Sequence, residues 1–490
     1  MKIHLLIFVI LPVFAVDYLK LIEEGFDENI SPCDNLYRYV CPINEKKFFL
    51  EVIFEEYKKD IDQYEIPEKY VEMKELYEQM NIVYESQEVD APFMTDIVNK
   101  LEQRCLNSRD EYAHILQNLE TLVKNKILPC YSAECFSSLL VYDDCHEAAS
   151  ILQVSLKSVF LDWSLNFLFI PAAIEVFKSY QWYENNKHAY DRLNNTVTII
   201  KSFASQLIST TPWIKNRNAT KIYETIANQL ILLDPLQYKK VNEIYLDEYS
   251  AKIEKCHLSL NESFLTPLCY LRAAQTTFIN EPFLFWSNSF NAFNAHPFMG
   301  INNPFVYIAG LDLPPAYFLG SVAQVLAHEV GHTYIVSAKG DNNLPYFPNE
   351  TRSCIQNQFE KSCQYFDEGG CETNDDKFEE DGADIFAYEM MYEILKFVYG
   401  NNLNDLVEGT TKNTTNLQLF FLGPSTTSCE KIPLVAKASH VHHASHIREN
   451  SVAAQNSDFA KTFNCPNDSK MVQSMSEKCN ILGENAAITR

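Results

Sequence analysis

Residues 321–338 read SVAQVLAHEVGHTYIVSA and contain the histidine pair that decides the fold, His328 and His332. Positions four apart lie on one face of a helix with about 3.6 residues per turn, so both imidazoles can reach one metal ion. Zn²⁺ held by two histidines and a carboxylate lowers the pKa of its water to about 7. Glu329 could take a proton from that water as it attacks a carbonyl. The stretch predicts a helix with a zinc site for peptide hydrolysis, the alternative being an HExxH pattern that arose by chance.

A third ligand is expected on a second helix that faces the first. The segment EEDGAD, which ends at Asp384, opens an apolar run predicted to stop at Gly400. Glu380 is assigned as the third ligand, and Asp384, four residues on, as the acceptor for a ligand imidazole. The small residues Gly382 and Ala383 would let the two helices approach closely. The alternative is a solvated acidic first turn, which the helix dipole favours in any case.

Further motifs follow in the order of a known family. Residues 325–332 (VLAHEVGH) and 380–384 (EDGAD) resemble the VxxHExxH and ExxAD motifs of the neprilysin and endothelin-converting-enzyme family of zinc endopeptidases. The other matching segments are NAF at 291–293, LFFL at 419–422 with Cys429 after it, Val441-His442 followed by Arg448, Asn456, Phe459, Phe463 and Cys465, and PCDNLYRYVC at 32–41. The resemblance is dense over residues 286–479 and 31–41 and thin between them.

The resemblance implies roles for four residues outside the zinc motifs. Asn291 and Ala292 would hold the substrate backbone as an added strand, and Arg448 would bind it too. His442 would stabilise the oxyanion, because an imidazole N–H aimed at developing charge stabilises the transition state. By spacing alone, HVHHASH at 440–446 favours an exposed polar loop over a second metal tract, and its other histidines receive no role.

Fourteen cysteines, an even number, favour disulfides in an oxidising compartment over zinc-finger ligands. The resemblance implies three pairs, which would tie the start of the chain to its C-terminal half: Cys33 with Cys465, Cys41 with Cys429, and Cys354 with Cys479. The pairing of the other eight stays open: Cys105, Cys130, Cys135, Cys145, Cys256, Cys269, Cys363 and Cys371.

The implied fold is mainly α: a two-lobed zincin, with a thermolysin-like catalytic domain that contains a small sheet and a reduced helical N-terminal domain. Only 13 of 490 residues are glycine, which also favours helices over all-β folds. We assign residues 1–15 to a signal peptide, 16–285 to the helical domain and 286–490 to the catalytic domain.

Periodicity supports this division. In the helical domain, Met94, Ile97, Val98 and Leu101 recur at helical spacing and predict a buried stripe. Beyond Trp286, SNSFNAFNAHPF and NNPFVYIAG set apolar residues among Asn and Pro, which indicates two short extended segments.

The first residues predict secretion. The apolar run from Ile3 to Phe14 is far shorter than the roughly 20 residues of a spanning helix. It is interpreted as a signal peptide with Val13 and Ala15 as the small residues before the cut, the alternative being an uncleaved anchor. Seven N-x-S/T sequons fit the same route: Asn29, Asn194, Asn218, Asn261, Asn349, Asn413 and Asn467. We therefore expect a released, glycosylated protein without a stable membrane anchor.

The net charge of −25 repels phosphate backbones and argues against nucleic-acid partners. The prediction is a secreted endopeptidase with one Zn²⁺ per chain and peptide substrates. Its rival is a catalytically inactive, secreted peptide-binding protein on the same scaffold. Ser428 and Gln324 stand where the family has an aromatic and an apolar residue near the pocket for the residue after the cut, which would make that pocket wider and more polar.

Overall fold

The structure is a computed structural model of the chain. It describes residues 15–42, 49–71, 73, 92–124, 144–150, 169–211, 214, 216–229, 231–232, 234–259, 269–270, 273–274, 276–277, 304–340, 349–366, 377–429 and 442–482. Residues 1–14 of the predicted signal peptide, and the NAF segment with Asn291 and Ala292, lie outside these residues.

The chain forms two compact units. Unit 1 takes residues 1–60, 183–233 and 289–490, and unit 2 takes residues 61–182 and 234–288. The described residues within 16–60 and 183–233, which the linear division assigns to the helical domain, thus pack with the catalytic segment. A division by sequence order misses this because the chain leaves unit 1 and returns to it twice.

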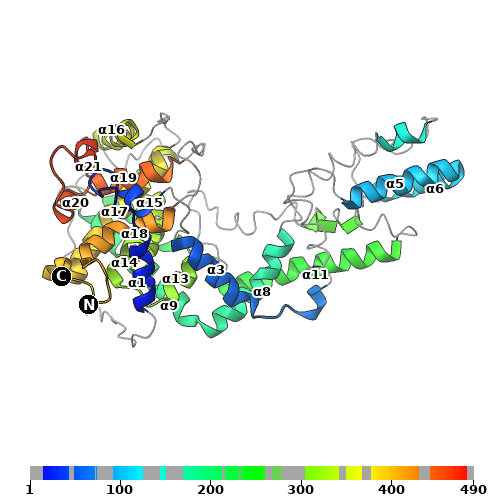
Figure 1. Cartoon of the computed structure of the whole chain (residues 1–490), viewed down its shortest axis with the longest axis horizontal. Coiled ribbons are helices and arrows are strands. Elements are labelled where there is room, and N and C mark those ends of the chain that lie inside the picture. Colours follow the sequence, from blue (N-terminus) through cyan, green and yellow to red (C-terminus); the bar gives the residue numbers. More distant parts are fainter. Residues whose placement is uncertain are drawn as a thin grey trace. The chain divides into compact units, whose positions relative to one another are not determined.

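Helices dominate both units (Figure 1). The helices of unit 1 are α1 (Ala15–Glu24), α2 (Leu36–Val40), α3 (Phe49–Asp62, its last two residues in unit 2), α9 (Lys187–Ser209), α10 (Asn216–Asn228), α13 (Pro304–Gly310), α14 (Pro315–Gly320), α15 (Val322–Gly340), α16 (Asn349–Phe366), α17 (Phe378–Tyr399), η4 (Gly400–Asn404), α18 (Asn416–Ser428), α19 (Ser445–Ala454), α20 (Ser457–Thr462) and α21 (Lys470–Ser474). Those of unit 2 are η1 (Glu68–Tyr70), α5 (Pro92–Asn107), α6 (Arg109–Lys124), α8 (Phe169–Asn185, its last three residues in unit 1) and α11 (Pro235–Ser259).

The predicted small sheet is not found among the described residues. The β pairing that joins two described residues is an isolated antiparallel bridge between Leu406 and Thr415. Part of NNPFVYIAG, expected to be extended, is the helix α13 instead. A short apolar run does not distinguish a strand from a buried helix by periodicity, and Pro304 stands at the helix start, where proline is well tolerated. The other expected strand, SNSFNAFNAHPF, lies outside the described residues.

Helices α15 and α17 pack closely against each other at the centre of unit 1. A Cβ atom on Gly331 would come within 2.9 Å of the Phe386 ring and 3.2 Å of the Ala383 carbonyl oxygen. A Cβ atom on Gly382 would likewise meet the Ile335 side chain at 3.1 Å. The small residues therefore set the distance between the helices that carry the two halves of the predicted zinc motif.

The predicted end of α17 is confirmed at Gly400. This residue has a φ of 55° and donates its N–H to the carbonyl of Lys396. Glycine adopts that left-handed conformation without a Cβ penalty, which is why it often follows the last helical residue.

Disulfides tie the N-terminal segment to the rest of unit 1. All three predicted pairs are present: Cys33–Cys465, Cys41–Cys429 and Cys354–Cys479. The structure adds two pairs within unit 2 that the sequence left open, Cys105–Cys145 and Cys256–Cys269. The first two pairs explain why α2 lies against α18 and α19, more than 370 residues further along the chain.

The apolar stripe that the sequence predicts lies on α5 of unit 2. Of the predicted stripe on α5, Ile97, Val98 and Leu101 are buried, and α5 packs against α6. Across the residues that the structure describes, no helix combines the length and the apolar character needed to span a membrane.

Candidate metal centre

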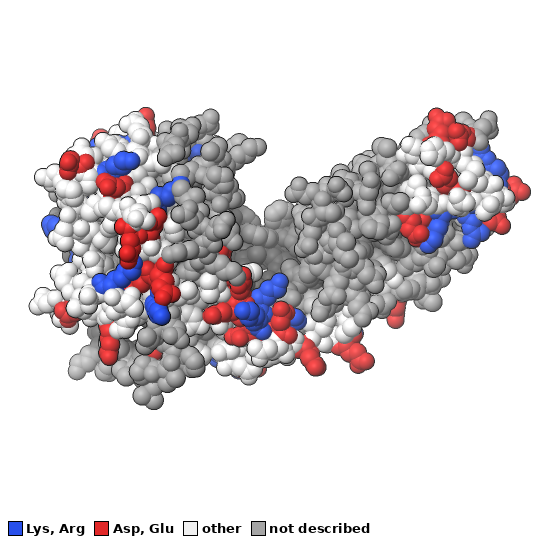
Figure 2. All heavy atoms as spheres, viewed as in Figure 1, with Lys and Arg blue, Asp and Glu red and all other residues white. Residues whose placement is uncertain are grey.

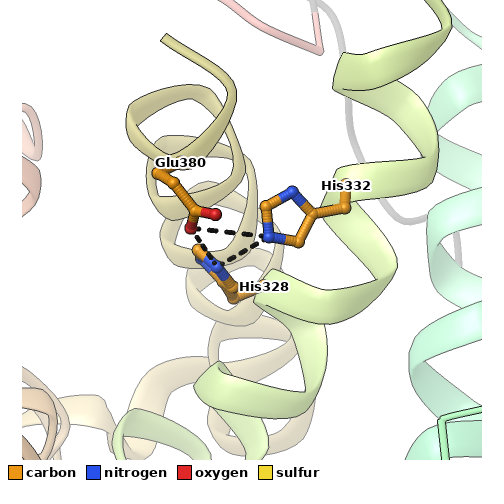
Figure 3. A group of neighbouring side chains, drawn as sticks. All are labelled: His328, His332 and Glu380. Carbon is orange, nitrogen blue, oxygen red and sulfur yellow. Dashed lines mark hydrogen bonds and ion pairs between the residues drawn. The ribbon is translucent and has the colours of Figure 1, made fainter. Parts of the chain in front are cut away.

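Three predicted ligands converge on one point between α15 and α17 (Figure 3). The Nε2 atoms of His328 and His332 lie 3.0 Å apart, and Glu380 Oε2 lies 3.1 Å from the first and 3.5 Å from the second. All three residues are buried. Two histidines from one helix and a carboxylate from the facing helix thus form a cluster that could hold a metal ion.

The donor set and its spacing fit zinc. Ligand atoms about 2.0–2.2 Å from a tetrahedral zinc ion lie about 3.3–3.6 Å from one another. The separations in the cluster, 3.0 to 3.5 Å, are close to these values. Two imidazole nitrogens and one carboxylate oxygen are also the protein ligands of catalytic zinc sites, which keep a fourth position open.

Asp384 holds the outer nitrogen of one ligand. Its Oδ1 lies 2.8 Å from His328 Nδ1, which leaves Nε2 of that ring directed at the cluster. Arg448, on α19, donates from Nε and Nη2 to the two oxygens of Asp384, both at 2.7 Å. This bidentate pair fixes the carboxylate, so Arg448 orients His328 through Asp384. The guanidinium was predicted to bind substrate backbone, and the bonds to Asp384 use two of its five N–H groups.

His442 reaches the cluster from the segment that precedes α19. Its Nε2 lies 3.0 Å from Glu380 Oε2, and its side chain is 34% exposed. It stands outside the group of ligand atoms that lie within 4.8 Å of one another. The ring therefore flanks the metal position on an open side, where a substrate oxygen could approach.

Glu329 lies on the same helix turn as His328, and it is buried. Its backbone carbonyl accepts a hydrogen bond of 2.6 Å from the side chain of Gln229, which follows α10. The carbonyl of Gln229 in turn accepts from Lys201 on α9. Two segments from before residue 286 thus support the helix turn that carries the predicted general base, a connection that no motif signals.

The charges of the cluster are strongly coupled. Burial lowers the pKa of His328, but the charge of Asp384 and hydrogen bonds to Asp384 and Glu380 outweigh it and raise the pKa to about 10. Burial raises the pKa of Glu380, but hydrogen bonds with His328, His332 and His442 hold it well below its usual range. Glu380 is therefore ionised, as a metal ligand must be, and a metal ion would displace a proton from His328.

Sequence reasoning missed a second buried pair beside the ligands. His443 Nδ1 lies 2.8 Å from Asp381 Oδ1, and both side chains are almost fully buried. Burial raises the pKa of Asp381 to about 6, although the hydrogen bond from His443 opposes this. Neither spacing nor resemblance assigned His443 a role, and the only signal was its position next to His442, matched by that of Asp381 next to Glu380.

Ser428, one of the departures from the family pattern, has an acidic neighbour. Its side chain hydrogen-bonds to Glu449, the residue after Arg448. Burial and the charge of Asp384 raise the pKa of Glu449 to about 7. Gln324, the other departure, is buried on α15. The surroundings of Ser428 are therefore polar, as its side chain suggests.

Comparisons with known proteins agree with the motifs. The family model "Peptidase family M13" matches residues 298–479, a segment that includes the three ligands, Glu329, Asp384, His442 and Arg448. This match confirms the resemblance to the neprilysin-like family over that segment. No curated protein matches the sequence.

Two solved structures align with most of the chain at low sequence identity. A structure of the Haemonchus galactose-containing glycoprotein complex aligns over 95% of this chain and 98% of its own, with 13% identity and a TM-score of 0.53. The zinc metalloprotease Zmp1 of Mycobacterium tuberculosis, in complex with an inhibitor, aligns over 92% of this chain and 97% of its own, with 11% identity and a TM-score of 0.48. The first likeness indicates a common helical architecture along nearly the whole chain.

Proposed function

With residues 298–479 as a segment of peptidase family M13, we propose that this protein is an active, secreted zinc endopeptidase that cleaves peptides or small proteins. One observation carries the proposal. His328, His332 and Glu380 converge with separations of 3.0 to 3.5 Å. Of the two residues that would act on substrate, His442 lies 3.0 Å from Glu380, and Glu329 follows His328 directly on α15. A scaffold that only bound peptides would not need this full set.

The residues of the metal centre have two roles: three would bind the metal ion, and two orient the ligand His328. His328, His332 and Glu380 would hold the metal, and Asp384, fixed by Arg448, holds His328 in the tautomer that presents Nε2. Zinc at this point supplies a Lewis acid and lowers the pKa of a coordinated water to about 7.

Two side chains would transfer the proton of the attacking water and stabilise the negative charge on the carbonyl oxygen. Glu329 accepts the proton of the attacking water and delivers it to the leaving amine, which is general acid–base catalysis by one positioned carboxylate. His442 donates to the carbonyl oxygen as negative charge develops there. Its partly exposed ring allows contact with a substrate, and such a donor contributes most in the transition state. Asn291 and Ala292, with Arg448, remain the proposed contacts for the substrate backbone.

Two conservative substitutions test the proposal. Glu329→Gln should keep zinc and lose peptide hydrolysis, because the base is removed and no ligand is. Glu380→Gln should bind zinc much more weakly, because a ligand carboxylate is removed. Zinc content by elemental analysis and cleavage of a mixed peptide library, measured on both variants and the natural protein, separate the two roles.

The same measurements can contradict the proposal. Full zinc occupancy in the Glu380 variant would move the third ligand elsewhere, with Glu379 as the next candidate. A zinc-loaded natural protein that binds library peptides without cleaving them would establish the inactive, peptide-binding alternative. Hydrolysis that a chelator abolishes and zinc restores would support the enzyme.

Secretion and glycosylation belong to the same proposal. Five of the sequons lie among residues whose exposure the structure describes, and all five asparagines are exposed: Asn29, Asn194, Asn349, Asn413 and Asn467. Expression in a eukaryotic secretory host should release a protein that begins at Val16 and loses mass on glycosidase treatment. Retention of residues 1–15 in the membrane fraction would indicate the uncleaved anchor instead.

A further inference from the structure

Two consecutive residues of α17 face two consecutive residues of the segment before α19. Glu380 lies 3.0 Å from His442, and the next residue, Asp381, lies 2.8 Å from the next histidine, His443. One turn further along α17, Asp384 holds Arg448. The segment 442–448 is therefore attached to the ligand-bearing helix at three successive points.

The two histidines differ in how they are held. The side chain of His442 is 34% exposed, whereas that of His443 is 1% exposed and is stacked on Phe359 of α16, with ring centres 5.3 Å apart. Helices α16 and α17 thus both contact His443, through Phe359 and Asp381. His442 has the geometry of a side chain that meets substrate, and His443 has the geometry of an anchor.

Core packing alone does not explain the buried pair of Asp381 and His443. His443 Nε2 is buried and has no hydrogen-bond partner among the described residues, and Asp381 is a buried acid. A buried polar pair contributes little net stability over well-packed apolar residues, because both groups lose hydration. What the pair does supply is direction, since a hydrogen bond fixes the ring and hence the backbone next to it.

We propose that Asp381 and His443 are positioning residues that hold His442 at the metal centre. The inference rests on the proposed function, in which His442 acts on the substrate oxygen. Its physical basis is that a displacement of about 1 Å in a catalytic group can reduce the rate by about 100-fold. The backbone of His443 is bonded to that of His442, so a shift at the anchor is passed directly to the catalytic ring.

The first test compares His443→Ala with His443→Asn. The alanine removes the hydrogen bond, and kcat should fall by about 10- to 100-fold with KM little changed and zinc content intact. Asparagine places an amide N–H near the position of Nδ1 and should restore most of kcat. Equal losses in both variants would assign His443 to packing alone and overturn the proposal.

His446→Ala is the matched control. His446 is also a buried histidine of this segment, but it lies beside Tyr37 of α2, with ring centres 6.1 Å apart. Its truncation should lower thermal stability to a similar degree and leave kcat unchanged. A loss of kcat as large as that of His443→Ala would show that any cavity in this segment disturbs catalysis, which contradicts a specific anchor.

A double mutant identifies the residue through which the pair acts. If His443 acts only through His442, His443→Ala should cause no further loss of kcat in a His442→Ala background. A full additional loss, or a loss of zinc, would mean that the pair acts through Glu380 instead and would overturn the assignment.

One readout is independent of activity. The N–H groups of Ile447 and Arg448 donate to the carbonyl of Ala444 in the first turn of α19. His443→Ala should speed hydrogen exchange at these amides, and His443→Asn should not. If the natural protein cleaves no peptide but His443→Ala still speeds this exchange, the proposed function is wrong, whereas the positioning role of His443 is supported. If the natural protein is active and His443→Ala leaves the exchange unchanged, only the positioning role is wrong.

Discussion

Two helix pairs of this protein place similar charged groups in opposite surroundings. On α5 and α6 in unit 2, Lys100 pairs with Asp96 and Arg104 with Glu111, and all four side chains are about half exposed. Figure 2 shows blue and red spheres mixed in the region that these helices occupy in Figure 1. Between α15 and α17 in unit 1, the side chains of His328 and Asp384 are 11% and 9% exposed.

The difference is one of dielectric surroundings. Water and salt screen the pairs on α5 and α6, so each contributes little and acts independently of its neighbours. The α15–α17 charges have lost their hydration and attract one another more strongly, so each is needed to compensate the next. Removal of one charge from α5 or α6 should change stability little. A charge between α15 and α17 instead supports a network that includes the metal ligands.

Arg448→Ala should break the buried network most severely. Asp384 would lose the partner of both its oxygens, and removal of one partner from a buried pair costs about 3–5 kcal/mol of stability. His328 would be oriented less well, so zinc affinity should fall by about 10- to 100-fold. Thermal unfolding and competition with a chelator measure the two effects.

Arg448→Lys is the control for charge alone, because lysine keeps the charge without the bidentate fork. It should recover part of the stability and little of the zinc affinity. If KM rises in Arg448→Ala while zinc affinity and stability are unchanged, Arg448 does not orient His328, and the contact with substrate backbone is its only role.

His442→Ala tests the partly exposed histidine that flanks the cluster. The ring would act mainly in the transition state, so kcat and kcat/KM should fall together by about 100-fold or more, with KM little changed. Zinc content should stay full, because His442 stands outside the ligand group. Loss of zinc with the activity would make it a fourth ligand, and the site would then be closed.

Much of this centre could be predicted from the sequence, because local spacing carried the information. The i, i+4 pairs His328/His332 and Glu380/Asp384 specify one face of each helix, and the structure brings those faces together. The three disulfides predicted from the resemblance are also present. Spacing left one alternative for Glu380, a solvated acidic turn, and its burial among three histidines excludes that alternative.

Long-range contacts could not be predicted in this way. The pairing of Asp381 with His443 joins residues 62 apart, and the bond from Gln229 to Glu329 joins residues 100 apart. Neither has a periodicity or a motif that would reveal it. The helix α13 was missed for a local reason, since an apolar run of its length fits a strand equally well.

Glu389 is a buried acid on the part of α17 that leads away from the site, and its substitution should have a smaller effect. Its carboxylate accepts hydrogen bonds from the backbone of Ile481 and Leu482, and burial raises its pKa to about 7 from 4.5. A carboxyl that binds its proton more tightly when folded destabilises the protein as pH rises from about 4.5 to 7. Glu389→Gln should therefore raise stability by about 1–3 kcal/mol at pH 8 and change it little at pH 4. Equal effects at the two pH values would show that the carboxyl titrates normally.

Lys100→Ala on α5 should have the smallest effect. Lys100 Nζ lies 2.6 Å from Asp96 Oδ2, in the i, i+4 arrangement that stabilises exposed helices by about 0.2–0.5 kcal/mol. Alanine has the highest helix propensity, so the intrinsic preference for helix offsets part of the loss. The free energy of unfolding should change by less than about 0.5 kcal/mol, and the change should vanish in 1 M salt, where exposed charges are screened within about 3 Å. Peptide hydrolysis should be unchanged. A loss above about 2 kcal/mol, or one that persists in high salt, would show that this exposed pair is coupled to its surroundings as the α15–α17 charges are, and the contrast between the two helix pairs would no longer hold.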